Sequence, residues 1–211
     1  MKNVAEKDSV LLNEIQSLLD KNAVEVVPRQ AWLEGWYSHY FLVTKKTGGW
    51  RPILNLRPLN RLIRVDSFRM ETLRNVILAT WPGEWLASID LKDAYFHVPI
   101  LPEHRKYLRF CVQGVVYQYR VLPFGLSTSP RIFTKVLSAV IAHIRLQGVH
   151  IHPYLDDLLL RAQSPQALQL AAQQAVQALE GAGFLVNYAK SHLTPCQDLT
   201  YVGGRFRTDL G

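Results

Sequence analysis

Apolar residues recur at helical spacing near the N-terminus of the 211-residue chain. Asp8–Ser9 has the residue types that cap the start of a helix, and Lys21–Asn22 closes the apolar run. We therefore predict a short amphipathic helix between these two pairs. Its apolar face consists of Leu11, Leu12, Ile15, Leu18 and Leu19.

Two later segments have the same helical period. Ser129–Pro130 and Ser164–Pro165 predict their starts, because Pro is favoured in the first turn of a helix. Gly181 and Gly183 are expected to end the later helix. The apolar face of the earlier helix consists of Ile132, Phe133, Val136, Leu137, Val140, Ile141 and Ile144. That of the later helix consists of Leu168, Ala171, Ala172, Ala175, Val176 and Leu179.

Three pairs of short apolar runs predict β-hairpins. The first pair lies in residues 39–56 around a Gly-rich basic tip, and the second lies in residues 108–121 around Gln113–Gly114. The third lies in residues 149–161, where Tyr154-Leu155-Asp156-Asp157 interrupts the apolar runs. Each hairpin implies an antiparallel pair of strands.

Single runs predict further strands. Residues 86–90 predict a buried strand that ends on Asp90, followed by a turn and a strand near His97–Ile100. Residues 184–186 and 199–202 predict the last strands. Because helices and strands interleave without a regular βαβ rhythm, we expect an α+β fold with antiparallel pairs in one sheet and helices on one face.

Composition and charge narrow the class of protein. No run reaches the roughly 20 consecutive apolar residues of a membrane span, and the N-terminus lacks the apolar core of a secretory signal, so we expect an intracellular protein without a membrane partner. The net charge is +7, and residues 45–74 carry +6 of it. This basic segment suits a polyanion such as nucleic acid, and a solvated basic face is an equally good interpretation from composition alone.

The acidic residues suggest chemistry. Asp90 follows a predicted buried strand, and Asp156–Asp157 lies at a predicted turn. Carboxylates from neighbouring strands are able to bind two Mg²⁺ ions for phosphoryl transfer. The alternative is that each acid only favours a turn or a cap. His150 and His152 have no third ligand nearby in the sequence and are interpreted as structural or surface residues.

These acids belong to a series of motifs that resembles the reverse transcriptase family over almost all of residues 10–206. The motifs, in chain order, are Lys45–Lys46 with Trp50-Arg51-Pro52, then Leu56–Asn60, Ser88–Phe96, Leu122–Pro130, Tyr154–Asp157, Lys190 and Leu199–Gly203. Several motifs in the right order are a much more specific signal than one acidic dipeptide. The segment Asp90–Ile100, together with His104–Phe110, looks most like retrotransposons, in particular the DIRS-like group.

The resemblance implies roles for the acidic residues. Asp90, Asp156 and Asp157 match the catalytic aspartates, which bind two Mg²⁺ ions, or Mn²⁺ in their place, with help from the carbonyl group of Leu91. Lys190 matches the general acid that protonates the leaving pyrophosphate, although a surface lysine is almost as good an interpretation.

The resemblance also implies a substrate site. Lys46 and Arg51 match residues that grip the triphosphate, and Arg51 is able to stack on the incoming base; the alternative for both is a solvated hairpin tip. Tyr95 matches the steric gate against a 2′-hydroxyl, with a buried core tyrosine as the alternative. Phe124 stands where retroviral enzymes have glutamine, so we expect apolar stacking on the sugar. Gly125 permits close backbone approach.

The last motif matches the primer grip, a hairpin that aims the primer terminus at the metal ions. Its residues are Tyr201, Val202 and Gly203, and an apolar edge strand would look the same from sequence. The implied fold is the α+β palm of a right-hand polymerase, an antiparallel sheet with helices packed on one face, plus fingers and without a thumb. The predicted domains are an N-terminal helix and lead-in at 1–38, fingers at 39–85, and palm at 86–211 with a fingers insertion near 101–125.

The implied function is an RNA-directed DNA polymerase core. Its expected partners are deoxynucleoside triphosphates and an RNA or DNA template with its primer, contacted through the sugar–phosphate backbone. Thumb and ribonuclease H domains are expected downstream in a longer parent, and without a thumb we expect weak, salt-sensitive binding. The alternative is a non-catalytic nucleic-acid-binding or scaffold remnant of a retroelement. Tyr95 disfavours an RNA-copying polymerase, which needs room for the ribose hydroxyl.

Overall fold

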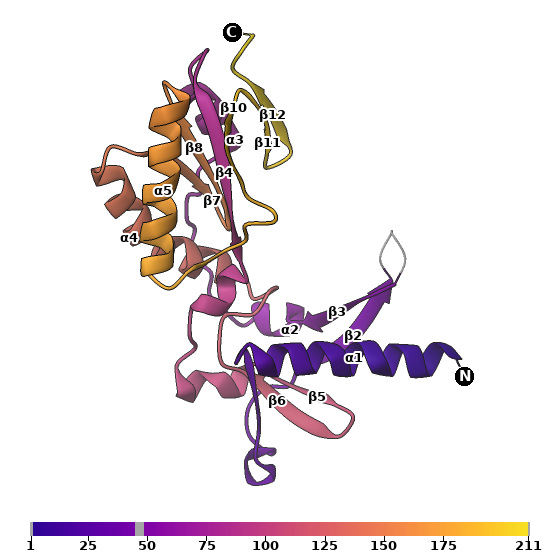
Figure 1. Cartoon of the computed structure of the whole chain (residues 1–211). Helices are drawn as coiled ribbons and strands as arrows, with labels where there is room; N and C mark the ends of the chain where they lie inside the picture. Colours follow the sequence, from indigo (N-terminus) through magenta and orange to yellow (C-terminus); the bar gives the residue numbers. More distant parts are fainter. Residues whose placement is uncertain (1, 45–48, 211) are drawn as a thin grey trace. The chain divides into compact units, whose positions relative to one another are not determined.

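The computed structural model describes residues 2–44 and 49–210, which form two compact units (Figure 1). Unit one comprises Met1–Asp66 and Val98–Ser129, and unit two comprises Ser67–His97 and Pro130–Gly211. The boundary at Asp66 falls inside the basic segment 45–74. The predicted domain boundaries remain predictions.

Unit one begins with helix α1 (Lys2–Asp20), which packs Ile15 and Leu18 into the core. The predicted start at Asp8–Ser9 is wrong, because this pair lies inside α1; Ala5, Glu6 and Lys7 are good helix formers and extend the helix upstream. The predicted end is confirmed, since Asn22 adopts a left-handed conformation with φ 55° just beyond the last turn.

The strands of unit one form a sheet and a separate hairpin. The three-stranded sheet has the order β1-β6-β5, and β2 pairs with β3 in register Tyr40↔Leu54. Phe110 is fully buried and stacks on Tyr40 with ring centroids 4.8 Å apart. The strand bounds are β1 Val24–Val26, β2 His39–Thr44, β3 Trp50–Asn55, β5 Arg109–Val112 and β6 Val115–Tyr119. Short helical segments are η1 Arg29–Ala31, α2 Arg57–Asn60 and η3 Pro102–Tyr107.

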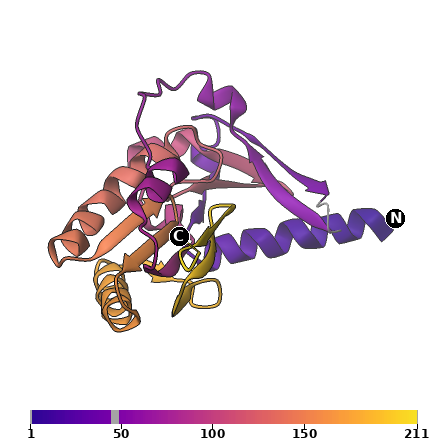
Figure 2. The same ribbon diagram turned by 90° about the horizontal axis from the view of Figure 1, so that it is seen from above.

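Unit two is built on a five-stranded sheet, in which four strands have the order β10-β4-β8-β7 and the fifth, β9, also pairs with β4. Its strands are β4 Trp85–Lys92, β7 His150–Tyr154, β8 Asp157–Ala162, β9 Leu185–Val186 and β10 His192–Cys196. Helices α4 (Ser129–Leu146) and α5 (Pro165–Gly181) lie on one face of this sheet, as predicted (Figures 1 and 2). On α4, Val136 is exposed although it belongs to the predicted apolar face.

The opposite face of this sheet is also covered. Helix α3 (Leu73–Ala79) and the hairpin of β11 (Asp198–Tyr201) and β12 (Gly204–Arg207) pack there. Their shared core consists of Val76, Leu86, Leu159, Leu199, Tyr201 and Phe206. Counting the two hairpins, the described strands form four separate sheets, so the expectation of one sheet is wrong.

One predicted strand does not form. Residues His97–Ile100 follow a 3₁₀ helix, η2 (Ala94–His97), and make a single bridge, Pro99↔Val121. The N–H groups of Ile100 and Leu122 donate the two hydrogen bonds of this bridge, and the 3₁₀ helices that end at His97 and begin at Pro102 leave no extended residues to lengthen it.

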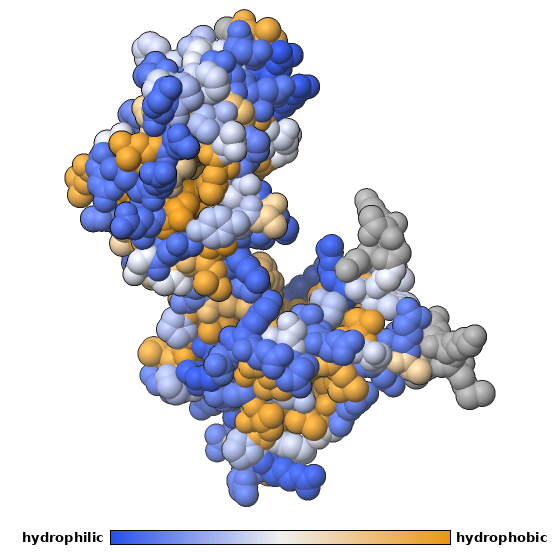
Figure 3. Space-filling model, in the orientation of Figure 1, coloured by the Kyte–Doolittle hydropathy of each residue, from blue (hydrophilic) through white to orange (hydrophobic). Residues whose placement is uncertain are grey.

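The surface is hydrophilic over most of the face that Figure 3 displays, with smaller hydrophobic patches between the polar side chains. None of the helices in the described ranges combines the length and the apolar character that a membrane span requires.

Candidate active site

Asp90 and Asp157 face each other across two antiparallel strands of unit two. Strand β4 pairs with β8 in a register that places Asp90 directly opposite Asp157. Directly opposed residues have Cβ atoms roughly 4.5–5.5 Å apart, and alternate residues of a strand share one face. Leu86 and Leu159 lie in the core under the β11–β12 hairpin, so Asp90 and Asp157 lie on that same face of the sheet.

Asp156 occupies the turn between β7 and β8. The preceding residue, Leu155, has φ 53°, a left-handed conformation that is uncommon for a bulky side chain. The N–H group of Leu91 donates a hydrogen bond to the carbonyl oxygen of Asp156 at 2.9 Å, which ties the turn to β4. Backbone strain of this kind persists where the surrounding structure holds it, and it is concentrated at functional sites.

The three carboxylates repel one another. Burial and the neighbouring charges of Asp156 and Asp90 raise the pKa of Asp157 to about 6. Burial, and then the charge of Asp90, also raises the pKa of Asp156. Lys190 opposes both shifts, so its ammonium group lies close enough to act on the two carboxylates. The structure thus brings the four predicted catalytic residues into one neighbourhood.

Lys190 reaches this position from the turn between β9 and β10. Its N–H group donates to the carbonyl oxygen of Asn187 at 3.2 Å, and its side chain is exposed. The N–H group of Asn187 in turn donates to the carbonyl oxygen of Asp90 at 2.8 Å. The turn that carries the lysine is therefore attached to the strand that carries the acid, a link that residue types alone did not indicate.

Tyr95 combines features of both of its interpretations. Its side chain is 8% exposed, and its ring packs edge-on against Phe133 with centroids 5.5 Å apart. Burial and the charge of Asp156 raise the pKa of its hydroxyl group. Tyr95 is therefore a core residue that also lies near the acids, and its role as a steric gate remains a prediction.

The predicted primer-grip residues form the turn of the β11–β12 hairpin. Val202 and Gly203 have φ 49° and 76°, as a tight two-residue turn requires. Tyr201 is buried, and its hydroxyl lies within donating distance of the carbonyl oxygens of His152, at 2.9 Å, and Asp157, at 3.0 Å. The side chain of Tyr201 thus bonds to the strands that carry the acids, while Val202 is half-buried against the core and Gly203 is exposed.

Sequence analysis missed a second charged cluster, which includes His152 of β7, Arg161 of β8 and Glu84 just before β4. Glu84 is 1% exposed and accepts hydrogen bonds from Arg161 at 2.8 Å and Gln163 at 3.0 Å. Arg161 also donates to Nε2 of His152 at 3.0 Å, and Nδ1 of His152 donates to Glu71 at 2.8 Å. His152 is therefore structural, as its isolation from other ligands suggested.

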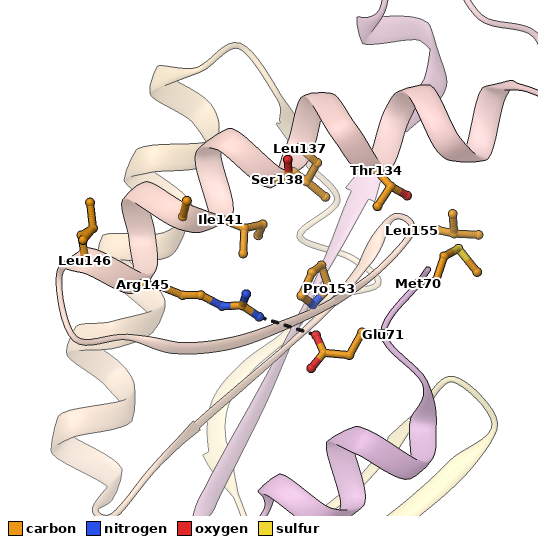
Figure 4. A pocket seen from close by; sticks show the side chains of 11 residues that line it. Met70, Glu71, Thr134, Leu137, Ser138, Ile141, Arg145, Leu146, Pro153 and Leu155 are labelled. Atoms are coloured by element: carbon orange, nitrogen blue, oxygen red, sulfur yellow. Dashed lines mark ion pairs between the residues drawn. The ribbon is translucent and has the colours of Figure 1, made fainter. Parts of the chain in front are cut away.

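The second cluster ends beside a cavity. Arg145 pairs with Glu71 at 3.5 Å, and together they form one wall of a cavity of about 470 Å³ between α4, the β7–β8 turn and residues 70–71 (Figure 4). Most of the other side chains that line it are apolar, including Leu137, Ile141 and Leu155.

The predicted substrate residues of unit one lie apart from these acids in the chain. Arg51 is exposed on β3, and Lys46 lies outside the described residues. Phe124 is 59% exposed, and Gly125 has φ 89°. Asn60 stabilises the turn that contains Phe124 and Gly125. Its side chain donates to the carbonyl oxygen of Gly125 at 2.8 Å and accepts from the N–H group of Ser127 at 2.9 Å.

The donor chemistry suits Mg²⁺. Within residues 2–44 and 49–210, no group of three or more His, Cys, Asp or Glu side chains is arranged to hold a metal ion by itself. Mg²⁺ is usually bound by only one or two carboxylates together with substrate phosphates. The facing carboxylates of Asp90 and Asp157 supply those donors, and their mutual repulsion favours a divalent cation between them.

A family model for "Reverse transcriptase (RNA-dependent DNA polymerase)" matches residues 43–206. The chain belongs to the reverse transcriptase family. This reverse transcriptase domain is 30% identical over 173 residues to the Gag-Pol polyprotein of Rous sarcoma virus subgroup B (strain Schmidt-Ruppin), covering 77% of this chain and 11% of the polyprotein. It is 26% identical over 150 residues to the transposon Tf2-3 polyprotein of Schizosaccharomyces pombe, covering 70% of this chain and 11% of that polyprotein.

Solved structures confirm the predicted α+β fold of the reverse transcriptase domain. The foamy viral protease–reverse transcriptase in complex with double-stranded DNA aligns with a TM-score of 0.80 at 20% identity, covering 96% of this chain and 34% of that one. The native protease–reverse transcriptase of prototype foamy virus aligns with a TM-score of 0.74 at 24% identity, covering 91% of this chain and 24% of that one. Retroviral and transposon polyproteins both match, so these relatives do not support the DIRS-like group specifically.

Proposed function

We propose that this chain is the polymerising core of an RNA-directed DNA polymerase, which adds deoxynucleotides to a primer. The observation that carries the proposal is the facing pair Asp90 and Asp157, with Asp156 in a strained turn beside them and the charge of Lys190 acting on them. In this proposal unit two is the palm, and unit one contributes fingers. The template, primer and nucleotide are the partners.

Each residue has a defined part in the proposed reaction. The carboxylates of Asp90, Asp156 and Asp157, with the carbonyl group of Leu91, would hold two Mg²⁺ ions, which when bound supply Lewis-acid stabilisation of the charge on the phosphates. Lys190 donates a proton to the leaving pyrophosphate as a general acid.

The remaining residues bind and select the substrate. Arg51 and Lys46 bind the triphosphate, and Arg51 stacks its guanidinium plane on the base. Tyr95 excludes the 2′-hydroxyl by size, and Phe124 packs on the sugar next to the open backbone of Gly125. Val202 and Gly203 support the primer strand, while the hydroxyl of Tyr201 holds the backbone of Asp157.

Primer extension on an RNA template tests the proposal. Asp157→Asn and Asp90→Asn should each lower kcat/KM by roughly a thousand-fold, because they remove several kcal/mol of charge stabilisation. Glu103→Gln, which neutralises an exposed acid in unit one, is the matched control and should retain activity. Absence of extension by the wild-type chain, or an active Asp157→Asn variant, would favour the alternative of a nucleic-acid-binding scaffold.

A further inference from the structure

Asp90 lies at a gap in the sheet. One edge of β4 pairs with β10 up to His192↔Ser88, and the same edge pairs with β9 from Leu91↔Val186 onward. Neither strand pairs with Asp90, which lies between these two registers. A backbone N–H or carbonyl group at such a point needs another partner, because an unpaired buried group costs free energy comparable to a lost hydrogen bond.

The turn from Asn187 to Ser191 supplies those partners. The N–H group of Asp90 donates to Oγ of Ser191 at 2.9 Å, and the carbonyl oxygen of Asp90 accepts from the N–H group of Asn187 at 2.8 Å. The hydroxyl of Ser191 also donates to the carbonyl oxygen of Asn187 at 2.7 Å. One hydroxyl therefore accepts from the strand and donates to the turn, and so replaces the strand that is missing at this position.

We propose that Ser191 is a positioning residue that fixes the backbone of Asp90 opposite Asp157. The inference rests on the proposed function, because the position of Asp90 matters only if its carboxylate acts there. The same turn carries Lys190, so loss of the Ser191 hydroxyl would loosen the acid and the ammonium group together. Only a side chain that both donates and accepts at short reach can bridge strand and turn in this way.

The size of the expected effect follows from the sensitivity of such sites to position. Residues that orient metal-binding groups typically change metal affinity or activity by about 10–100-fold when they are replaced. A displacement of about 1 Å is enough to cost roughly a hundred-fold in rate. We therefore expect Ser191→Ala to lower kcat by about 10–100-fold, whereas KM for the nucleotide changes little because Ser191 does not belong to the proposed nucleotide site.

A set of serine variants separates positioning from stability. Ser191→Ala removes the hydroxyl and Ser191→Thr retains it. The matched control is Ser164→Ala, because Oγ of Ser164 also accepts a backbone N–H group, that of Ala167 at 3.1 Å, at the start of α5. Thermal unfolding, primer-extension kinetics and Mn²⁺ binding, followed by the electron paramagnetic resonance of free Mn²⁺ without nucleotide or primer, are measured for each full chain.

The expected result is that Ser191→Ala loses both kcat and Mn²⁺ affinity, Ser191→Thr recovers both, and Ser164→Ala loses only stability. Ser191→Ala with wild-type kcat and Mn²⁺ affinity would overturn the inference, as would equal losses in Ser164→Ala. If Ser191→Ala does not fold, Ser191→Cys makes the same comparison, since a thiol is a weak donor and acceptor. If the wild-type chain extends no primer, the proposed function fails while Mn²⁺ affinity still tests Ser191.

Discussion

Two clusters of charged residues each include residues of strand β8, Asp157 in one and Arg161 in the other, and they differ in how their charges are balanced. In the cluster of Arg161, Glu84 and Glu71 are paired with Arg161, His152 and Arg145. We call this the balanced cluster. In the other, the acidic cluster of Asp90, Asp156 and Asp157 is opposed by Lys190, and the pKa of Asp157 is raised to about 6.

The difference separates buried charges that are fully paired from acids that are not, and only the unpaired acids take part in the chemistry of the proposed function. A buried charge that finds its counter-charge and hydrogen bonds is stable in the folded chain, and it leaves nothing for a ligand to satisfy. Acids that are close together without enough counter-charge make the folded chain less stable and attract cations. A raised carboxylate pKa at a strained turn is therefore a better guide to the site than the presence of acidic residues alone.

The largest stability effect is expected in the balanced cluster. Arg161→Met leaves Glu84 buried without its cation, and breaking a buried pair in this way typically costs about 3–5 kcal/mol. Arg207→Met, which breaks an exposed pair with Asp209, is the control and should change the free energy of unfolding by less than about 1 kcal/mol. Urea denaturation measures both. Equal, small losses would mean that the cluster does not stabilise the fold.

The next effect concerns selectivity near the acidic cluster. Tyr95→Val should raise ribonucleotide incorporation relative to deoxynucleotide incorporation by ten-fold or more, because size exclusion is worth about 1–3 kcal/mol. Primer-extension kinetics with each nucleotide type measure the ratio of specificity constants. An unchanged ratio in a folded, active variant would mean that the packing of Tyr95 on Phe133 is its only role.

Tyr201 links the two clusters, because its hydroxyl reaches the carbonyl oxygens of both His152 and Asp157. Tyr201→Phe removes these bonds and should lower the free energy of unfolding by about 1 kcal/mol. Primer affinity should stay near that of the wild type, because the side chain is buried. A large loss of primer affinity at unchanged stability would instead make the hydroxyl a direct primer contact.

The smallest effect has the opposite sign. Asp157→Asn should raise the midpoint of thermal unfolding at pH 7.5 without divalent ions. The native pKa of about 6 exceeds the ordinary value of 3.8, so ionisation of Asp157 destabilises the native chain above pH 6 and has no such effect below about pH 4. The gain should therefore shrink as the pH falls from 6 to 4. A gain that does not depend on pH would contradict the assigned repulsion.

The sequence alone determined the elements that have strong local signals. Ser164 with Pro165 predicted the start of α5, and the structure shows the Ser164 side chain accepting from Ala167 as an N-cap. Helical periodicity predicted α4, and alternating apolar runs predicted the three hairpins. The motifs predicted the family, because several short motifs in one order along the chain are shared by few other protein families. Their chemical roles were carried by that resemblance and remain proposals.

Local sequence signals failed to predict strands whose formation depends on tertiary contacts. Strand β10 was missed because Pro195 interrupts it and its register shifts between His192 and Cys196, so it exists only through pairing with β4. Around Pro99 the apolar run predicted a strand, but the 3₁₀ helices that end at His97 and begin at Pro102 leave room for a single bridge only.

Only the tertiary structure decided which acids meet and what holds them. The sequence predicted Asp90 at the end of a strand and Asp157 in a turn. In the structure β4 continues past Asp90 to Lys92, β8 begins at Asp157, and the β4–β8 register places the two acids opposite each other. The bond from Asp90 to Ser191 joins residues 101 positions apart, and the bonds of Tyr201 depend equally on long-range packing. Such contacts have no local pattern, because hydrogen-bond partners are chosen by distance in the folded chain and not by spacing along it.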